Sequence, residues 1–269
     1  MEPFQFHQLS EQVELKYKGG TRGPASNFTP SGKLLICLFW LRNGFTYRFL
    51  SWLFEIPSLA TVKQYLDDAK KCLLEILTPL VSFPAETRRN LAGSFYGGIV
   101  TLVIDGAEQE VYSSSDKDLS YTSFSGKKNY HTFSKLIGVS PNGGIMFVSK
   151  SFLGGMNDLN LVQMPENLKA LKVDDDEFIL ADRGFRGMEK YNILTENTPT
   201  TFSSEPDYAS KFRGIRVKVE NGILWVKTWK ACGMLYRVHP KKIQKALQKH
   251  HQMWSICCGL VNYVMFPSE

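Results

Sequence analysis

Two aspartates directly follow runs of apolar residues that are typical of buried β-strands. Asp105 ends the run "LVID" and Asp182 ends the run "FILAD". An ionised carboxylate at the end of a buried strand is costly unless a cation neutralises it. Two such carboxylates suit Mg²⁺, which prefers oxygen ligands and keeps waters for a phosphate substrate. The pair therefore predicts a site for phosphodiester cleavage, with two metal ions roughly 3.5 to 4 Å apart. The alternative is ordinary turn chemistry, since Asp-Gly and Asp-Arg-Gly are common in turns.

A third carboxylate would complete such a site, and Glu220 is the sole acidic residue between Asp207 and Glu269. It lies in "RVKVENGILWVK", residues 216–227, which can be read in two ways. The alternating apolar residues around Asn-Gly are typical of a β-hairpin. As a helix, the same stretch would place Arg216, Glu220 and Lys227 within about 40 degrees of one face. Glu220 could then hold metal while its two basic neighbours contact phosphate.

The segments around these residues indicate an α/β core. A strand ending on Asp105 is predicted within residues 97–106, and a strand ending on Asp182 is predicted within residues 177–185. Two further strands are predicted in residues 130–141 and 144–152, and a helix is predicted in residues 157–171. Three strands, a helix and a further strand would place both aspartates at carboxyl ends of strands. Open α/β sheets carry their functional sites at that edge.

The residues before this core are helical in pattern. Residues 1–28 are polar and then glycine-rich, which predicts a flexible arm. Ser31, Thr46 and Ser58 can each cap a helix, and together they predict a helix-turn-helix domain over residues 29–92, ahead of a nuclease domain over residues 93–269. The third helix would present Lys63 and Gln64 to a DNA groove. A small helical bundle without a DNA role is the alternative.

The charge distribution supports a polyanionic partner. The net charge is +6, and residues 211–249 contain eleven Lys and Arg against one acid, Glu220. Such a stretch suits DNA, or else forms a solvated basic face. Five scattered cysteines without metal-site spacing predict buried thiols in a reducing compartment. We expect no signal peptide and no membrane span.

Several motifs occur in order from about Pro30 to Asn262. They are a helix-turn-helix-like stretch over residues 29–62, "IDGAE", "YTSFSGKKNYHT", "GGMND", "LADRGFRG", and the Arg-x3-Glu-x6-Lys spacing. In this order they resemble the transposases of the PIF/Harbinger group. The resemblance implies an RNase H-like α/β fold, a mixed sheet with flanking helices, preceded by an all-α helix-turn-helix domain. It also favours the helix over the hairpin for residues 216–227.

The resemblance implies roles for individual residues. Asp105 and Asp182 would hold two Mg²⁺ or Mn²⁺ ions at the strand ends, and Glu220 would be the third ligand. Asp158, in "GGMND", would either replace Asp182 as a ligand or cap the helix that follows. Lys127, Lys128 and His131 match a stretch that would meet the DNA backbone, although solvated strand residues would fit as well.

The resemblance further implies a nuclear enzyme that cleaves and joins double-stranded DNA at transposon ends and target sites. A separate Myb-like DNA-binding protein would be its partner, and a homo-oligomer is compatible with this role. The chain departs from the family pattern at Ala107, Asn157 and Gly222. These changes fit a divergent working enzyme, and they fit equally a catalytically inactive, domesticated DNA-binding or scaffold protein of the same fold.

Overall fold

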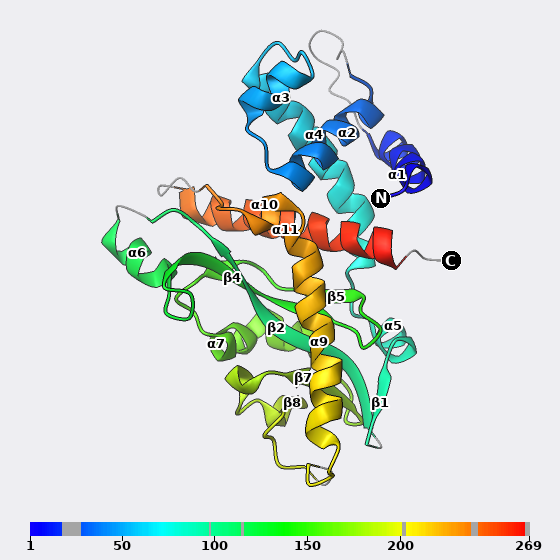
Figure 1. The fold of residues 1–269 in the computed structure, drawn as a ribbon, viewed down its shortest axis with the longest axis vertical. Coiled ribbons are helices and arrows are strands. Elements are labelled where there is room, and N and C mark those ends of the chain that lie inside the picture. Colours follow the sequence, from blue (N-terminus) through cyan, green and yellow to red (C-terminus); the bar gives the residue numbers. More distant parts are fainter. Residues whose placement is uncertain (18–27, 97, 114–115, 201–202, 238–241, 267–269) are drawn as a thin grey trace.

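The protein is a mixed β-sheet with helices on both faces and a layer of helices at one end (Figure 1). The computed structural model describes residues 1–17, 28–96, 98–113, 116–200, 203–237 and 242–266. The α/β class expected from the sequence is confirmed, as is the order of helices first and sheet second. No described helix is both long and apolar enough to span a membrane. All five cysteines are free and buried, as expected.

The sheet is built around one long central strand, β2 (Gly98–Glu110). β2 pairs antiparallel with β4 and parallel with β7, and β7 pairs parallel with β8. Shorter strands extend the sheet: β1 pairs with β2, while β3, β5 and β6 pair with β4. The bounds of these strands are β1 Gly93–Phe95, β3 Phe124–Ser125, β4 Tyr130–Val139, β5 Ile145–Val148, β6 Phe152–Leu153, β7 Glu177–Ala181 and β8 Ile193–Thr195.

The first predicted strand is longer than the sequence indicated. It was expected to end on Asp105, but β2 continues to Glu110. The reason is that β4 pairs with β2 from Val103 through Glu110, so the main-chain ladder continues on one side after β7 has ended at Ala181. Asp105 therefore lies within a strand, whereas Asp182 directly follows β7 as predicted.

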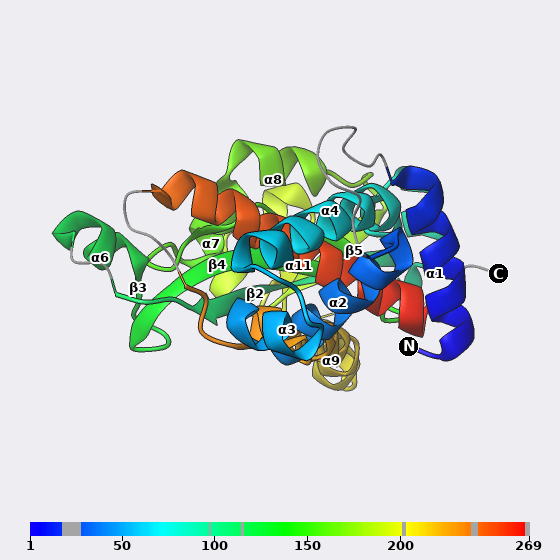
Figure 2. The same cartoon turned by 90° about the horizontal axis from the view of Figure 1, so that it is seen from above.

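Helices cover the two faces of the sheet with two separate sets of buried side chains. Helix α9 (Tyr208–Lys227) lies on one face, and α7 (Asp158–Gln163) and α8 (Pro165–Ala170) lie on the other (Figure 2). The expected single helix over residues 157–171 is thus two helices, because Pro165 has no N–H to continue the first and starts the second instead.

Residues 216–227 are helical, so the helix predicted for them is confirmed and the hairpin is wrong. Val219, Gly222 and Val226 are buried at helical spacing against the sheet. A Cβ atom on Gly222 would lie 2.8 Å from Cγ2 of Val139 in β4. Gly222 therefore allows α9 to approach the sheet closely, and burial of this face overrides the local Asn-Gly turn signal.

The N-terminal helices begin largely where the sequence predicted. They are α2 (Pro30–Asn43), α3 (Tyr47–Leu53) and α4 (Leu59–Leu77). Thr46 and Ser58 cap α3 and α4 as expected. The cap of α2 is Thr29 and not Ser31, because Thr29 accepts the hydrogen bond of the Gly32 N–H while Pro30 occupies the first helical position. The hydroxyl of Ser31 instead bonds to Glu14.

The arm expected over residues 1–28 is wrong for its first half. Helix α1 (Pro3–Lys16) packs against α2 and α4, with Leu9 and Val13 fully buried. The helix has few apolar positions, so its sequence pattern does not predict a helix. Packing against α2 and α4 stabilises it instead. Residues 18–27 of this expected arm lie outside the described residues.

Helix α11 (Ile243–Met265) lies between the N-terminal helices and the sheet (Figure 1). It approaches α4 so closely that a Cβ atom on Gly259 would lie 2.5 Å from Cβ of Leu77. Side chains of α4, α11 and α9 belong to one continuous core with one face of the sheet. The domain boundaries at residues 28 and 92 stay predictions.

A fully buried lysine lies on the same face, beneath α11. Lys135 of β4 has no exposed surface, and its Nζ lies 5.1 Å from the ring centroid of Trp254. The remaining short elements are α5 Ala85–Asn90, α6 Lys117–Ser123, α10 Lys230–Gly233 and the 3₁₀ turns Thr78–Leu80, Arg183–Phe185 and Glu189–Tyr191.

Candidate active site

Asp105 and Asp182 are brought together by the parallel pairing of β2 and β7. Ile104 pairs with Ala181, so the two aspartates are the next residues in the same register. Side chains alternate between the faces of a sheet. Val103 of β2 and Leu180 of β7 belong to the core on the α9 face, and the aspartates two residues later point to that same face. The adjacency expected from the sequence is therefore present.

Asp158 approaches the pair from the opposite face. It is the first residue of α7, and its carboxylate lies against the backbone of β2 and of the turn after β7. A Cβ atom on Gly106 would lie 2.2 Å from Oδ1 of Asp158, and one on Gly184 would lie 3.5 Å from Oδ2. Only a residue without a side chain leaves room at Gly106. The cap of α7 is Asn157, whose side chain accepts the Asn160 N–H at 2.8 Å. The capping role expected as one alternative for Asp158 is thus filled by its neighbour.

Backbone N–H groups orient two of the three carboxylates. Oδ1 of Asp105 accepts the N–H of Gly106 at 2.7 Å, and Oδ1 of Asp182 accepts the N–H of Gly184 at 2.7 Å. Each of these two aspartates therefore has one oxygen fixed by a nearby backbone N–H and a second oxygen for another partner.

Burial and like charges make this cluster unfavourable for ionised carboxylates. Burial, followed by the charges of Asp182 and Asp158, raises the pKa of Asp105 to about 6, against the opposing effect of the Gly106 N–H and of Lys127. The pKa of Asp158 is raised by burial first, and by Asp182 and Glu108. The structure thus holds three carboxylates where their negative charges oppose one another.

Lys127 is the cation closest to this cluster in the described ion pairs. Its Nζ lies 3.6 Å from Oδ2 of Asp158. Partial burial lowers the pKa of Lys127, but Asp158, Asp105 and Asp182 raise it further than burial lowers it. One lysine cannot balance three aspartates together with Glu108, which Thr132 holds at 2.7 Å. The negative excess and the oxygen donors fit divalent cations.

The third predicted ligand, Glu220, is not part of the cluster. It lies on α9, and its Oε1 accepts a hydrogen bond from Nη2 of Arg216 at 2.6 Å. Its side chain is 47% exposed. Within the described residues, no three His, Cys, Asp or Glu side chains are grouped closely enough to hold a metal ion, and this applies to the three aspartates as well as to Glu220. Glu220 therefore lies on the helix that covers the face of the sheet to which Asp105 points, but its carboxylate is paired with Arg216 of the same helix.

Lys227 is the last residue of α9, and it lies near the aspartates on the side of the helix that carries Glu220. The pKa of Lys227 is lowered by burial first and by Lys128, while Glu108 and Asp105 act in the opposite direction. Lys227 is thus close enough to the cluster to experience its charge. Lys227 follows Glu220 by seven positions, which is about two helical turns, so both lie on the same side of the helix.

The other predicted DNA contacts are divided between two regions. Lys127 and Lys128 lie in the turn between β3 and β4, where Lys127 contacts Asp158. His131 follows in β4, where its ring contacts Phe124. Lys63 and Gln64 are exposed on α4, in the N-terminal helices, and Lys63 forms an ion pair with Asp67 at 2.6 Å. Glu108 was missed from the sequence, although the extension of β2 beyond Asp105 places it next to the site.

One family of known proteins matches the part of the chain that carries the aspartates and Glu220. The model of the DDE superfamily endonuclease family matches residues 104–262, which is more than half of the chain. The match begins one residue before Asp105 and includes Asp158, Asp182 and Glu220. No curated protein and no solved structure matches the chain.

Proposed function

The chain belongs to the DDE superfamily endonuclease family, and we propose that it is a metal-dependent DNA transposase or endonuclease of the PIF/Harbinger type. It would cleave and join phosphodiesters of double-stranded DNA at transposon ends and target sites by a two-metal mechanism. The observation that carries the proposal is the meeting of Asp105 and Asp182 at neighbouring parallel strands, under the helix that carries Glu220.

The cluster supports a division of roles among its residues. The free oxygens of Asp105 and Asp182 would hold the metal ions, with Asp158 next to them on the other face of the sheet. Bound Mg²⁺ or Mn²⁺ would supply an activated water and neutralise charge on the phosphate. Glu220 would join the ligands by exchanging its ion pair with Arg216 for metal. Lys127 and Lys227 would contact DNA phosphates on either side.

More distant regions would hold the rest of the DNA. We propose that α2 to α4 act as a helix-turn-helix in which Lys63 and Gln64 contact the duplex, supported by their exposure on α4. The first part of α11 is basic and carries Lys245 and Lys249. Contacts of this kind are largely to phosphate, so binding should weaken steeply as salt increases.

The wider biological setting is also part of the proposal. A transposase acts on chromosomal DNA, so we propose a nuclear location, which imaging of a fluorescent fusion would test. A Myb-like DNA-binding protein would be its partner and self-association would accompany DNA binding. Co-purification with candidate Myb-like proteins and light scattering with and without DNA would test these two points.

A second function is favoured by one specific observation. Glu220 is paired with Arg216, and no three acidic side chains among the described residues, the three aspartates included, are grouped closely enough to hold a metal ion. An inactive, domesticated protein that binds DNA or serves as a scaffold would keep the same fold with such an arrangement. The two functions differ in whether the aspartates cleave DNA.

Cleavage of supercoiled plasmid by the purified protein distinguishes them. Nicking should require Mg²⁺ or Mn²⁺ and should fall by at least about 100-fold in Asp105→Asn, because the amide has the same shape but cannot hold the ion as strongly. Asp175→Asn is the matched control, since Asp175 is exposed in the loop before β7. It should nick as the wild type does.

The outcomes separate the hypotheses. Equal nicking by the wild type and Asp105→Asn would overturn the metal site. Binding of duplex DNA by the wild type, with no nicking in either metal, would favour the inactive scaffold. Glu220→Gln tests the third ligand, because loss of nicking with unchanged DNA affinity is the result expected of a ligand.

A further inference from the structure

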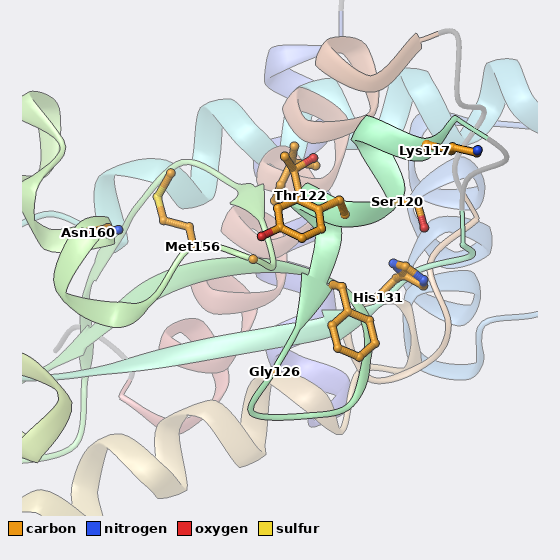
Figure 3. A pocket seen from close by; sticks show the side chains of 11 residues that line it. Lys117, Ser120, Thr122, Gly126, His131, Met156 and Asn160 are labelled. Atoms are coloured by element: carbon orange, nitrogen blue, oxygen red, sulfur yellow. The ribbon is translucent and has the colours of Figure 1, made fainter.

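A groove lies beside the aspartate cluster and is not used by the proposed chemistry. It has a volume of about 1010 Å³ and is formed by α6, the β3–β4 turn and the segment that leads into α7. Figure 3 shows Met156 and Asn160 at one end of the groove and Lys117, Ser120 and His131 at the other. The remaining lining residues are Tyr121, Thr122, Phe124, Gly126, Leu153 and Gly155.

Exposed aromatic rings line this groove. Tyr121 is 85% exposed and Phe124 is 42% exposed, although aromatic side chains usually bury most of their surface. The rings of Phe124 and His131 meet at an angle of 73° with their centroids 5.5 Å apart, so the two rings are not stacked in parallel. Leu153 and Met156 add apolar surface. A flat, apolar ring is the kind of ligand that such walls accept.

Polar groups occur along the same groove. Ser120 and Asn160 contribute a hydroxyl and an amide, and Lys117 contributes a positive charge at the end distant from Asn160 (Figure 3). Ligand sites are commonly apolar clefts with a few such polar groups that fix orientation. The ligand expected from this lining has a flat ring, polar ring edges and a nearby negative charge.

The groove and the aspartates share two structural elements. Gly126 lines the groove, and the next residue, Lys127, lies 3.6 Å from Oδ2 of Asp158. Asn160 lines the groove from α7, the helix that Asp158 begins. A nucleic-acid strand whose phosphate is held at the aspartates would therefore reach the groove with the adjoining nucleotide.

We propose that this groove receives an unpaired DNA base next to the phosphodiester at the aspartates. The base would stack on Tyr121 and Phe124, its polar edge would meet Ser120 or Asn160, and Lys127 and Lys128 would hold the adjoining phosphates. This inference rests on the proposed function, since it takes the strand at the aspartates to be DNA. Stacking on aromatic rings tolerates any base, so the groove would bind unpaired strands irrespective of sequence.

Binding of forked DNA in EDTA tests the groove without cleavage. The probes are a fluorescein-labelled fork with unpaired thymidine arms, the same fork with abasic arms, and a blunt duplex. The wild type should bind the thymidine fork roughly 10-fold more tightly than the abasic fork, the effect expected of one stacked base. Tyr121→Ala should lose this difference and leave the affinity for the blunt duplex unchanged.

Two controls isolate the ring from the fold. Tyr121→Phe keeps the ring and should keep the preference for the thymidine fork. Tyr191→Ala removes another exposed tyrosine, outside the groove, and should also keep it. Equal affinity of the wild type for the two forks, or a preference that survives Tyr121→Ala, would overturn the inference.

The result is separable from the nicking assay. Asp105-dependent nicking together with equal binding of the two forks would overturn the groove and leave the nuclease in place. A base-dependent preference that is lost in Tyr121→Ala, in a protein that never nicks DNA, would support the groove and overturn the proposed catalysis.

Discussion

Replacement of Lys135 by methionine should stabilise the protein, and by an amount that depends on pH. Lys135 is fully buried in β4, and its Nζ has no hydrogen-bond partner among the described residues. Burial lowers its pKa from 10.5 to about 7, although Cys258, Cys232 and Cys257 act in the opposite direction. Methionine has a similar length and shape and carries no ionisable group.

The two pKa values determine the size of the effect. Below pH 7 the lysine is charged in both the folded and the unfolded protein, and burial of this charge lowers the free energy of unfolding by its full amount. The penalty decreases as the pH rises from 7 towards 10.5, because the unfolded chain, which binds the proton more tightly, loses this advantage. Linkage gives a cost of between about 4 and 5 kcal/mol at pH 6.5 and about 2 kcal/mol at pH 9. The advantage of Lys135→Met should therefore shrink by roughly 2 to 3 kcal/mol across this range.

Urea unfolding at several pH values would measure this difference. Each variant gives a free energy of unfolding, and the quantity of interest is Lys135→Met minus wild type at each pH. The buried His250 and the partly buried His251 lie near Lys135, and burial lowers the pKa of both, so they stay neutral in the folded protein over this range. Lys172→Met, at an exposed position, should show no pH-dependent difference. An advantage of Lys135→Met that stays constant from pH 6.5 to 9 would refute the reasoning.

Three further changes test the site and its supports. In metal-free protein, stability should fall as the pH rises from 4 to 6, because the pKa of Asp105 is raised to about 6; thermal melts should show that Asp105→Asn removes this fall and that Mn²⁺ stabilises only the wild type. Arg88→Met should cost about 2 kcal/mol in urea unfolding, since it removes a 2.6 Å bond to Glu177, a carboxylate with no exposed surface whose other ion pair, with Arg89 at 2.8 Å, remains; an unchanged midpoint would contradict the importance of this pair. Gly222→Ala should destabilise by roughly 1 to 2 kcal/mol because the new methyl group would meet a valine of β4, whereas Gly214→Ala, with open space in the same helix, should stabilise by up to about 1 kcal/mol; equal effects would show that α9 does not pack tightly on the sheet.

Local sequence patterns predicted the elements that carry strong and regular signals. Apolar runs located β2, β4, β5 and β7, and the carboxylates after two of them predicted that Asp105 and Asp182 would be neighbours. This succeeded because parallel strands that pair in register bring equivalent positions together. The caps Thr46 and Ser58 were recognisable because a single side chain forms the bond.

The remainder depended on contacts between distant segments. Helix α1 has too few apolar residues to be seen alone, and it is stabilised by α2 and α4. The extension of β2 beyond Asp105 needs the partner strand β4, and the approach of Asp158 needs the space at Gly106. The pairing of Glu220 with Arg216 is a choice of rotamer, which spacing along the chain does not determine.

The close contact between α4 and α11 fixes the distance between the N-terminal helices and the aspartates of the sheet. Helix α4 is not connected to the sheet by a loose tether, because Leu77 and Gly259 are in contact within one continuous core. A duplex held on α4 would consequently meet the aspartates at a set number of base pairs from its point of attachment. In the proposed function, the packing of α4 on α11 would therefore fix the number of base pairs between the DNA bound by α4 and the phosphodiester cut at the aspartates.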